Sequence, residues 1–405
     1  MASTTNIQNI LQDYRKEMQD ELAAILHYWQ LYTVDNTNGG FFGKVNNINE
    51  PDAAAGKGIV LHARILWTFS AAYSLTNDRD QLAIADRAFN YLISYFKDDE
   101  YGGVYWSVDY KGNMLESRKQ IYGLAFTIYG LSEYYAAAKN ETALSFAKEL
   151  YNIIEQYSFD KSHNGYLEAF ARDWQPLQDL RLSAKDANAS KTMNTHLHII
   201  EAYANLYKVW KDEGLEGKIE NLLSLFHNHF IDKQSGHLLL FFDGEWNEQP
   251  DVTSYGHDIE AAWLLLQCAE IIGDEVWVQT YQRHARTIAD AAAEGMDKDG
   301  GLWYEYEPKH NQLIKQKHWW PQAEAMIGYF NAWQLTGDIH YLQQSLNAWR
   351  FTQQYILDKE NGEWFWGVDD AYNIMPGEDK AGFWKCPYHN ARACMEIIRR
   401  VDSIV

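Results

Sequence analysis

The stretch EYGGVYW, residues 100–106, has a glycine turn followed at once by aromatic residues, and five similar stretches occur along the chain. The others are NGGFFG at 38–43, HNGYLEAF at 163–170, QSGHLLLFF at 234–242, DGGLWYEY at 299–306 and NGEWFWG at 361–367. One glycine in each stretch marks its position, and successive markers are 61 to 71 residues apart. The markers are Gly40, Gly103, Gly165, Gly236, Gly301 and Gly362. Regular self-similarity of this length is typical of an internal repeat, so the chain is predicted to consist of six copies of one unit.

Between the glycine stretches, apolar residues recur at helical spacing. A second series of breaks, at Asn77, Asn140, Gly214, Gly273 and Gly337, divides the repeats into two helices each. The helices that follow the glycine stretches are poor in charge, whereas the alternate helices, such as 80–97 and 216–230, carry more, so the first set is predicted to be buried. The predicted inner helices are 58–75, 120–137, 193–210, 254–272, 320–335 and 386–399.

This pattern predicts an all-α fold, an (α/α)6 barrel of six helix-hairpin repeats with short β-hairpin-like segments between repeats. The amphipathic N-terminal segment, about residues 7–32, supplies the first outer helix. Because the six repeats share one core, we expect a single catalytic domain over residues 1–405.

Composition narrows the range of partners. A net charge of −21 disfavours nucleic acids and anionic membranes. The N-terminus lacks the features of a signal peptide and no segment has 18 uninterrupted apolar residues, so we expect a soluble, cytoplasmic protein. We also expect it to be a monomer. Cys268, Cys386 and Cys394 are odd in number and lie in helical segments, which favours reduced thiols. Aromatic residues make up 15% of the chain, and aromatic faces stack on sugar rings.

Residues whose side chains can transfer protons, form hydrogen bonds or stack on a sugar recur in the first turns of the predicted inner helices. These first turns all lie at the same end of the barrel. Asn194 and His198 are spaced i,i+4, and His257 and Glu260 i,i+3, so each pair shares one helix face. The spacing therefore predicts one shared active site at the barrel mouth. The residues are, in chain order, His62, Arg64, Tyr122, Asn194, His198, His257, Glu260, Trp319, Trp320, Glu324, Trp384, His389 and Arg392.

A metal site is one alternative, because His196 with His198, and His227 with His229, form H-x-H pairs. Residues two apart face different sides of a helix, and no Cys/His spacing of the zinc type is present. The sequence also has no phosphate-loop, dinucleotide-binding or serine-hydrolase motif. We therefore expect no metal and no cofactor.

Two histidines at one mouth suit the removal and return of a proton, because imidazole titrates near neutrality. Removing a proton next to a sugar carbonyl places charge on the carbonyl oxygen, which Arg64 or a histidine N–H would stabilise. The competing chemistry is glycoside hydrolysis, which needs two carboxyl groups flanking the scissile bond. Glu260, Glu324 and Asp258 are available for it, but the histidines would then be idle.

Five motifs carry a family resemblance: KGIVLHARILW at 57–67, DANASKTMNTHLHIIEAY at 186–203, SYGHDIEAAW at 254–263, HWWPQAEAMIG at 318–328 and WKCPYHNARACMEII at 384–398. With them the chain resembles the N-acylglucosamine 2-epimerase superfamily and, within it, the cellobiose 2-epimerases. The resemblance implies reversible, cofactor-free inversion at C2 of the reducing-end glucose of β-1,4-linked disaccharides such as cellobiose and lactose.

The same resemblance implies roles for individual residues. His257 and His389 would be the catalytic pair, which acts through ring opening, a cis-enediolate, rotation about C2–C3, reprotonation and ring closure. Arg64 and His198 would stabilise the enediolate and assist ring opening. The implied substrate-binding residues are Asn194, Glu260, Tyr122, Asp186, Trp319 or Trp320, Glu324, and Trp384, which would stack on the second sugar.

Other activities stay open within this fold. An N-acylglucosamine 2-epimerase acts on an acetamido monosaccharide, and mannose or other aldose-ketose isomerases return the proton to C1. Isomerisation of the disaccharide to its ketose is a further side reaction. A sugar-binding protein without activity would keep the aromatic residues but would not need His389.

Overall fold

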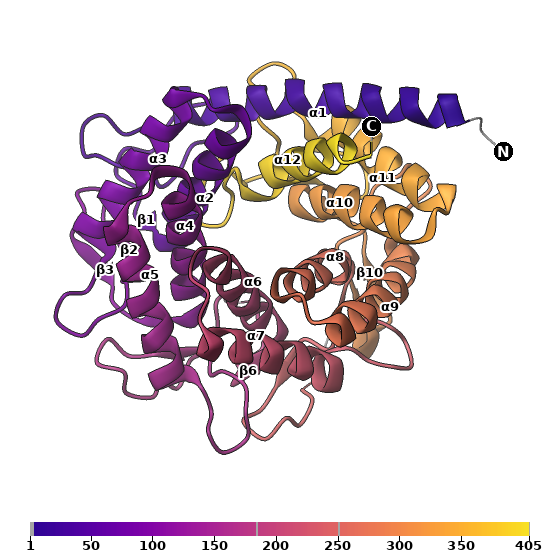
Figure 1. Ribbon diagram of the computed structural model, residues 1–405. Helices are drawn as coiled ribbons and strands as arrows, with labels where there is room; N and C mark the ends of the chain where they lie inside the picture. Colours follow the sequence, from indigo (N-terminus) through magenta and orange to yellow (C-terminus); the bar gives the residue numbers. More distant parts are fainter. Residues whose placement is uncertain (1–3, 184, 250–251, 405) are drawn as a thin grey trace.

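The computed structural model describes residues 4–183, 185–249 and 252–404. Two concentric rings of helices surround one axis (Figure 1). The inner helices are α2 (Ile59–Thr76), α4 (Ile121–Ala138), α6 (Met193–Val209), α8 (Tyr255–Ile272), α10 (Trp319–Thr336) and α12 (Tyr388–Asp402). The outer helices are α1 (Thr4–Tyr32), α3 (Arg79–Tyr91), α5 (Glu141–Ile153), α7 (Glu213–Leu225), α9 (Glu275–Ala292) and α11 (Ile339–Phe351).

The inner ring is closed. Each inner helix packs against the next one along the chain, and α12 packs against α2. The N-terminal helix α1 packs against α12, so it covers the last inner helix as an outer helix (Figure 1). The predicted (α/α)6 barrel is confirmed.

Helix boundaries follow from capping residues. Outer helices α3, α5, α7, α9 and α11 each begin after an Asp or Asn whose side chain accepts a hydrogen bond from the first helical turn. The inner helices α2, α8 and α10 end at Asn77, Gly273 and Gly337, which adopt the left-handed conformation. Gly214 was predicted as a break but lies inside α7, because Asp212 caps that helix instead. Helix α12 begins two residues later than predicted, since Pro387 disfavours the helical conformation of the residue before it.

Short strands and helical turns connect the rings. The strands are β1 (Lys57–Gly58), β2 (Ser107–Val108), β3 (Met114–Glu116), β4 (Lys119–Gln120), β5 (Ala169–Phe170), β6 (Lys191–Thr192), β7 (Phe241–Phe242), β8 (Thr253–Ser254), β9 (Glu305–Glu307), β10 (Gln312–Ile314), β11 (Lys317–His318) and β12 (Gly367–Val368). Outer helices α3, α5, α7 and α11 run into π-helical turns η1 (Leu92–Phe96), η2 (Ile154–Ser158), η3 (Phe226–Phe230) and η6 (Thr352–Ile356). The 3-10 turns are η4 (Ala293–Gly295) and η5 (Pro308–His310).

The glycine stretches form hairpins, and in each a β-bridge joins a residue shortly after an outer helix, and after any π- or 3-10 turn that extends it, to the residue that follows the glycine turn. The bridges are Val34–Phe41, Lys97–Val104, Phe159–Tyr166, Ile231–Leu238, Met296–Leu302 and Leu357–Trp364. The strand in front of an inner helix pairs with the strand after the next hairpin, as in β1–β2, β4–β5 and β6–β7. Neighbouring repeats are therefore joined by backbone hydrogen bonds as well as by helix packing.

Each of these turns begins with an aspartate that accepts hydrogen bonds from backbone N–H groups inside the turn. In five of the described hairpins a buried lysine also donates to that carboxylate, with N–O distances of 2.5 to 2.9 Å. The pairs are Lys57–Asp35, Lys119–Asp98, Lys191–Asp160, Lys317–Asp297 and Lys380–Asp358. The hairpin before α8 has Thr253 where other repeats have the lysine.

Removing one of these lysines is expected to destabilise the fold. Lys57→Met leaves the buried Asp35 carboxylate without its cation, and breaking a buried pair in this way costs roughly 3–5 kcal/mol. Lys44→Met removes an exposed partner of Asp379 and is expected to cost less than about 1 kcal/mol. Chemical denaturation of both variants measures the difference, and equal losses would contradict the assignment.

The pH dependence of this pair has a definite sign. Burial opposes ionisation of Asp35, but backbone hydrogen bonds and Lys57 outweigh it and lower the pKa of Asp35. Its contribution to stability is therefore present above the unfolded pKa of aspartate, about 3.9, and is lost as the pH falls through the lower folded pKa.

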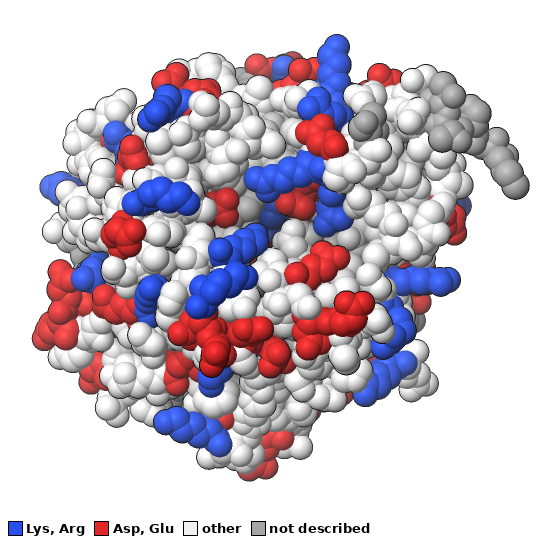
Figure 2. All heavy atoms as spheres, viewed as in Figure 1, with Lys and Arg blue, Asp and Glu red and all other residues white. Residues whose placement is uncertain are grey.

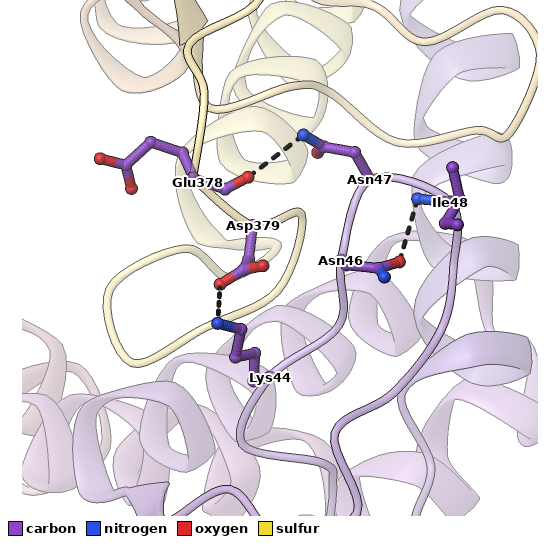
Figure 3. Close-up of a pocket in the computed structure, with 7 residues that line it drawn as sticks. Lys44, Asn46, Asn47, Ile48, Glu378 and Asp379 are labelled. Atoms are coloured by element: carbon purple, nitrogen blue, oxygen red, sulfur yellow. Dashed lines mark hydrogen bonds and ion pairs between the residues drawn. The ribbon is translucent and has the colours of Figure 1, made fainter.

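The first and last repeats meet at a seam formed by the bridge between Val45 and Ala381. A surface hollow of about 330 Å³ lies at this seam, lined by Lys44, Asn46, Asn47, Ile48, Gly377, Glu378 and Asp379. Figure 3 shows Lys44 paired with Asp379, at 3.1 Å, and the Asn47 side chain donating to the Glu378 carbonyl. None of the candidate active-site residues lines this hollow.

The face seen along the barrel axis carries charges of both signs around a central hollow, with acidic side chains gathered in a band beside it (Figure 2). Among the described residues, every helix is too short or too polar to cross a membrane.

Candidate active site

Equivalent positions near the start of the six inner helices bring six side chains to the barrel axis, and five of them are polar. The sixth residue of the first five inner helices and the fifth of α12 are Arg64, Phe126, His198, Glu260, Glu324 and Arg392. Contacts link them around the ring: the Arg64 guanidinium lies 4.1 Å from the Phe126 ring, Phe126 packs on His198, and Arg392 binds both glutamates. We call these six residues the axial ring.

Arg392 is the centre of a buried charge network. One terminal nitrogen, Nη2, donates to Glu260 at 2.6 Å and to Glu324 at 2.7 Å, and the other, Nη1, donates to Glu201 at 2.5 Å. All four side chains are buried. The carboxylates need this cation, because burying an uncompensated charge is strongly unfavourable.

Glu201 connects two sides of the barrel. It accepts hydrogen bonds from His198 Nδ1 at 2.9 Å and from the Tyr388 hydroxyl at 2.5 Å. Burial opposes its ionisation, but Arg392 and His198 outweigh burial and lower the pKa of Glu201 to about 2. Glu201 is therefore an anion at neutral pH, and it orients the His198 ring.

His389 lies against two axial-ring carboxylates. Its Nδ1 donates to Glu324 at 2.7 Å and lies 4.0 Å from Glu260. Burial lowers the pKa of His389, and Glu260 opposes that shift. Burial also raises the pKa of Glu324, against the attraction of Arg392. The Glu324 contact fixes the tautomer of His389 with its proton on Nδ1.

His257 has a neutral partner instead. Its Nδ1 lies 2.8 Å from the Ser254 hydroxyl, and its ring lies 4.8 Å from the Trp320 ring. Burial lowers the pKa of His257 to about 4, with Glu260 opposing the shift, so the ring is neutral at pH 7. Within the described residues the Nε2 atoms of His257 and His389 have no hydrogen-bond partner, so both are free to exchange protons.

Arg64 lies on α2, the inner helix that packs against α12. Its Nη2 donates to the Tyr122 hydroxyl at 2.7 Å, and its guanidinium packs on the rings of Phe126 and Tyr388. The buried Arg64 Nε has no hydrogen-bond partner in the described part of the chain. Tyr122 also packs edge-on against His198, so Arg64, Tyr122 and His198 form one contiguous group.

Tryptophans flank the mouth. Trp320 contacts both histidines, with its ring centroid 4.8 Å from that of His257 and 5.7 Å from that of His389. Trp384 lies across the axis against Trp106 and Tyr122, and its carbonyl accepts a hydrogen bond from Arg64. Both are only partly buried, whereas Trp319 is buried against Trp366. Trp320, not Trp319, is therefore the member of the pair on the axial side.

The remaining predicted residues lie further out. Asn194, in the first turn of α6, is partly buried, and its side-chain oxygen is buried without a partner among the described residues. Asp186 lies in the loop before β6 and accepts a hydrogen bond from the Ser183 N–H, without contacting the axial ring. His62 faces away from the axis, where its ring stacks on Tyr91, so it is not part of the site. A helix turns through about 200° between His62 and Arg64, which accounts for the difference.

Three residues of the site were missed by the sequence prediction: Glu201, Tyr388 and Ser254. Each holds a predicted residue through a hydrogen bond. Spacing could have suggested two of them, since Glu201 follows His198 by three positions and Tyr388 precedes Arg392 by four.

The donor set does not favour a metal. Glu260, Glu324 and His389 lie close enough together to bind an ion, but Arg392 already occupies the nearest oxygens of both glutamates. The two H-x-H pairs do not converge either. His196 binds backbone atoms of Thr192 and Tyr166, and His227 pairs with His284 while His229 stacks on Trp246.

Comparison with known proteins places this geometry in context. Residues 40–393 match the family model described as N-acylglucosamine 2-epimerase (GlcNAc 2-epimerase). A cellobiose 2-epimerase of Bacteroides fragilis is 48% identical, and the match covers 95% of this chain and 98% of that protein.

Two solved structures are similar over almost their whole length. Cellobiose 2-epimerase from Bacillus thermoamylovorans superposes with a TM-score of 0.91 at 41% identity, over 96% of this chain and 100% of that one. Cellobiose 2-epimerase from Spirochaeta thermophila superposes with a TM-score of 0.93 at 36% identity, over 99% of both chains.

Proposed function

The chain belongs to the N-acylglucosamine 2-epimerase family of carbohydrate epimerases, and we propose that it is a cellobiose 2-epimerase acting on reducing β-1,4-linked disaccharides. Cellobiose would give glucosyl-mannose and lactose would give epilactose, without a metal or a cofactor. The observation that carries the proposal is a pair of histidines with free Nε2 atoms, His257 and His389, whose rings both contact one tryptophan.

The reaction begins with opening of the reducing-end ring, which exposes an aldehyde at C1. One histidine then takes the C2 proton, the C2–H electron pair forms the C1–C2 double bond, and the carbonyl electrons move to O1. The product is a cis-enediolate. Rotation about C2–C3 presents its other face, and the second histidine delivers a proton to C2 as the carbonyl re-forms.

The axial ring supports each of these steps. Arg64 would stabilise the negative O1, because a fixed cation in a buried site stabilises developing charge strongly. The neutral His257 is suited to take a proton, and the carboxylate of Glu324 stabilises His389 when that ring is protonated. His198, held by Glu201, is positioned to assist ring opening from the Tyr122 side. Asn194, Glu260, Tyr122 and Asp186 would hold the sugar hydroxyls.

Incubation of the EDTA-treated protein in D2O tests the function. With cellobiose and lactose, NMR is expected to show deuterium at C2 together with glucosyl-mannose or epilactose. Fructose from mannose would indicate an aldose-ketose isomerase instead. N-acetylmannosamine from N-acetylglucosamine would indicate an N-acylglucosamine 2-epimerase. Free glucose from cellobiose would mean that Glu260 and Glu324 carry out hydrolysis.

Trp384 is expected to bind the second sugar. Trp384→Ala removes an aromatic face at the mouth, and loss of such a contact, about 1 kcal/mol, should raise KM for cellobiose roughly fivefold. KM for glucose should change little, because in this proposal only the second sugar stacks on Trp384. The control is Trp333→Ala, which removes a partly buried tryptophan at the far end of α10. Equal effects on both sugars would contradict the assignment.

We further propose that the protein acts as a monomer in the cytoplasm, with residues 1–405 forming a single catalytic domain. The three buried thiols, Cys268, Cys386 and Cys394, accord with a reducing compartment.

A further inference from the structure

One hairpin position separates two repeats from the others. The residue directly before the second bridge partner is glycine in four repeats, at Gly40, Gly103, Gly165 and Gly301. We call this the pre-bridge position. In the other two repeats it is His237 and Glu363.

These two hairpins precede α8 and α12, the helices that carry His257 and His389. The pre-bridge side chains reach those helices. His237 Nδ1 donates to Asp258 at 2.7 Å, and Glu363 accepts a hydrogen bond from the Asn390 side chain at 2.6 Å. Asp258 and Asn390 directly follow the two histidines in sequence, and both are buried. The two contacts are therefore equivalent, although the residues that make them differ.

The glycine repeats are built differently at this point. A Cβ on Gly40 would lie 2.7 Å from the Tyr91 ring, one on Gly165 would lie 2.5 Å from Trp246, and one on Gly301 would lie 2.9 Å from Phe351. An aromatic ring thus fills the space over the glycine. In the hairpins before α8 and α12 a polar side chain takes the pre-bridge position.

Glu363 also adopts an unfavourable backbone conformation. Its φ is +61°, in the left-handed region where Gly40, Gly103 and Gly165 also lie. A residue with a Cβ is disfavoured there, and strain of this kind persists mainly where a side chain is needed. Glu363 makes three contacts: besides Asn390 it accepts hydrogen bonds from Lys385 and from the Trp29 indole of α1.

His237 is likewise anchored at both ends of its ring. Its Nε2 lies 3.4 Å from the Glu294 carboxylate, opposite the contact with Asp258. Asp258 in turn accepts a hydrogen bond from the Leu238 N–H of the same hairpin. The first turn of a helix has backbone N–H groups without partners inside the helix, so it depends on such contacts to hold its position.

We propose that His237 and Glu363 are positioning residues, which fix the first turns of α8 and α12 and with them the His257 and His389 side chains. The inference rests on the proposed two-histidine reaction. Proton transfer depends steeply on geometry, and a displacement of about 1 Å costs roughly 10²-fold in rate.

The chain itself supplies the test substitutions. His237→Gly and Glu363→Gly introduce the residue that four repeats already have at this position, so the hairpin backbone accepts both. Glu363→Gly also leaves the buried Lys385 without its carboxylate and is expected to be less stable than His237→Gly. Each should lower kcat for cellobiose epimerisation by about 10- to 100-fold while KM changes less than about threefold. Gly103→Ala is the control: it disturbs the same position before α4, a helix without a histidine, so any loss of kcat should be smaller and the same from both epimers.

A second measurement distinguishes positioning from general damage. If each histidine serves one face of C2, a displaced His257 slows only one of the two proton transfers. The enediolate formed by His389 then returns to the starting sugar more often, after its proton has exchanged with solvent. In D2O, His237→Gly should therefore increase deuterium incorporation without inversion from one epimer, and Glu363→Gly should increase it from the other.

The two glycine variants distinguish a positioning role from general damage. Opposite asymmetries in the two variants support the proposal, whereas wild-type rates, or equal losses from both epimers, overturn it. His237→Gln and Glu363→Gln keep a hydrogen-bonding side chain without charge, so they should change the ratio of deuterium exchange to inversion in the same direction but by less. They provide the test if a glycine variant does not fold. A wild-type ratio of exchange to inversion in the glutamine variants also overturns the proposal. Absence of C2 exchange in the wild-type protein would instead count against the proposed function.

Discussion

In His389→Ala, the rate of C2 inversion of cellobiose is expected to fall by about 10³-fold, with a similar fall in His257→Ala, because general acid–base groups typically contribute 10²- to 10⁴-fold. In the proposed mechanism, each variant lacks the proton carrier for one face of C2. KM should change much less than kcat, since the sugar hydroxyls and the mouth tryptophans still bind.

Exchange with solvent makes this expectation more specific. With only one histidine left, the enediolate can form and revert from one epimer, so each single variant should retain C2 deuterium incorporation from one epimer while losing inversion. The double variant, which combines His257→Ala with His389→Ala, should lose both C2 deuterium incorporation and inversion. His310→Ala is the matched control, because His310 is exposed and contacts Glu307 at the surface. Normal inversion in either single variant would contradict the assignment of the pair.

The pH dependence follows from the surroundings of the two rings. Burial lowers the pKa of His257 to about 4, so the neutral ring is the major form from about pH 5 upward. Activity that requires neutral His257 is expected to fall as the pH drops through about 4, and not near 6.5, where an exposed histidine titrates. A profile of kcat/KM against pH, measured where the protein stays folded, checks this.

The barrel was predictable because its repeat is marked by residues with special backbone requirements. Glycines with positive φ, such as Gly102 and Gly103, and the Asp or Asn caps of the outer helices leave a signal at regular intervals in the sequence. The face of a helix on which a residue lies can also be predicted from its spacing to nearby residues. Trp320 precedes Glu324 by four residues and shares its face, whereas Trp319 does not, so this part of the site could have been derived from spacing.

The charge network was not predictable in this way. Glu201 resembles an ordinary helical glutamate, and its partner Arg392 is 191 residues away. Only closure of the ring brings α6, α8, α10 and α12 to one axis, so the pairing depends on the complete fold. The same holds for Trp29 and Glu363, which meet because α1 covers the last repeat.

Arg392→Met is expected to destabilise the barrel strongly. It leaves the carboxylates of Glu201, Glu260 and Glu324 without their shared cation, and loss of one partner of a buried ionic network costs roughly 3–5 kcal/mol. Urea denaturation at pH 7 measures the loss. Arg286→Met removes the exposed partner of Asp290 and should cost less than about 1 kcal/mol.

The loss caused by Arg392→Met should also depend on pH, with a sign that identifies its cause. In the wild type the pKa of Glu201 is lowered to about 2, so its contribution is present above the unfolded pKa of glutamate, about 4.3, and disappears as the pH falls through 2. In the variant the uncompensated carboxyls bind protons instead, and protonation relieves their repulsion. The difference in unfolding free energy between variant and wild type should therefore shrink from pH 7 to pH 4. A difference that stays constant over this range would mean that Arg392 stabilises the barrel by packing on Tyr388 and Trp263, and not by its charge.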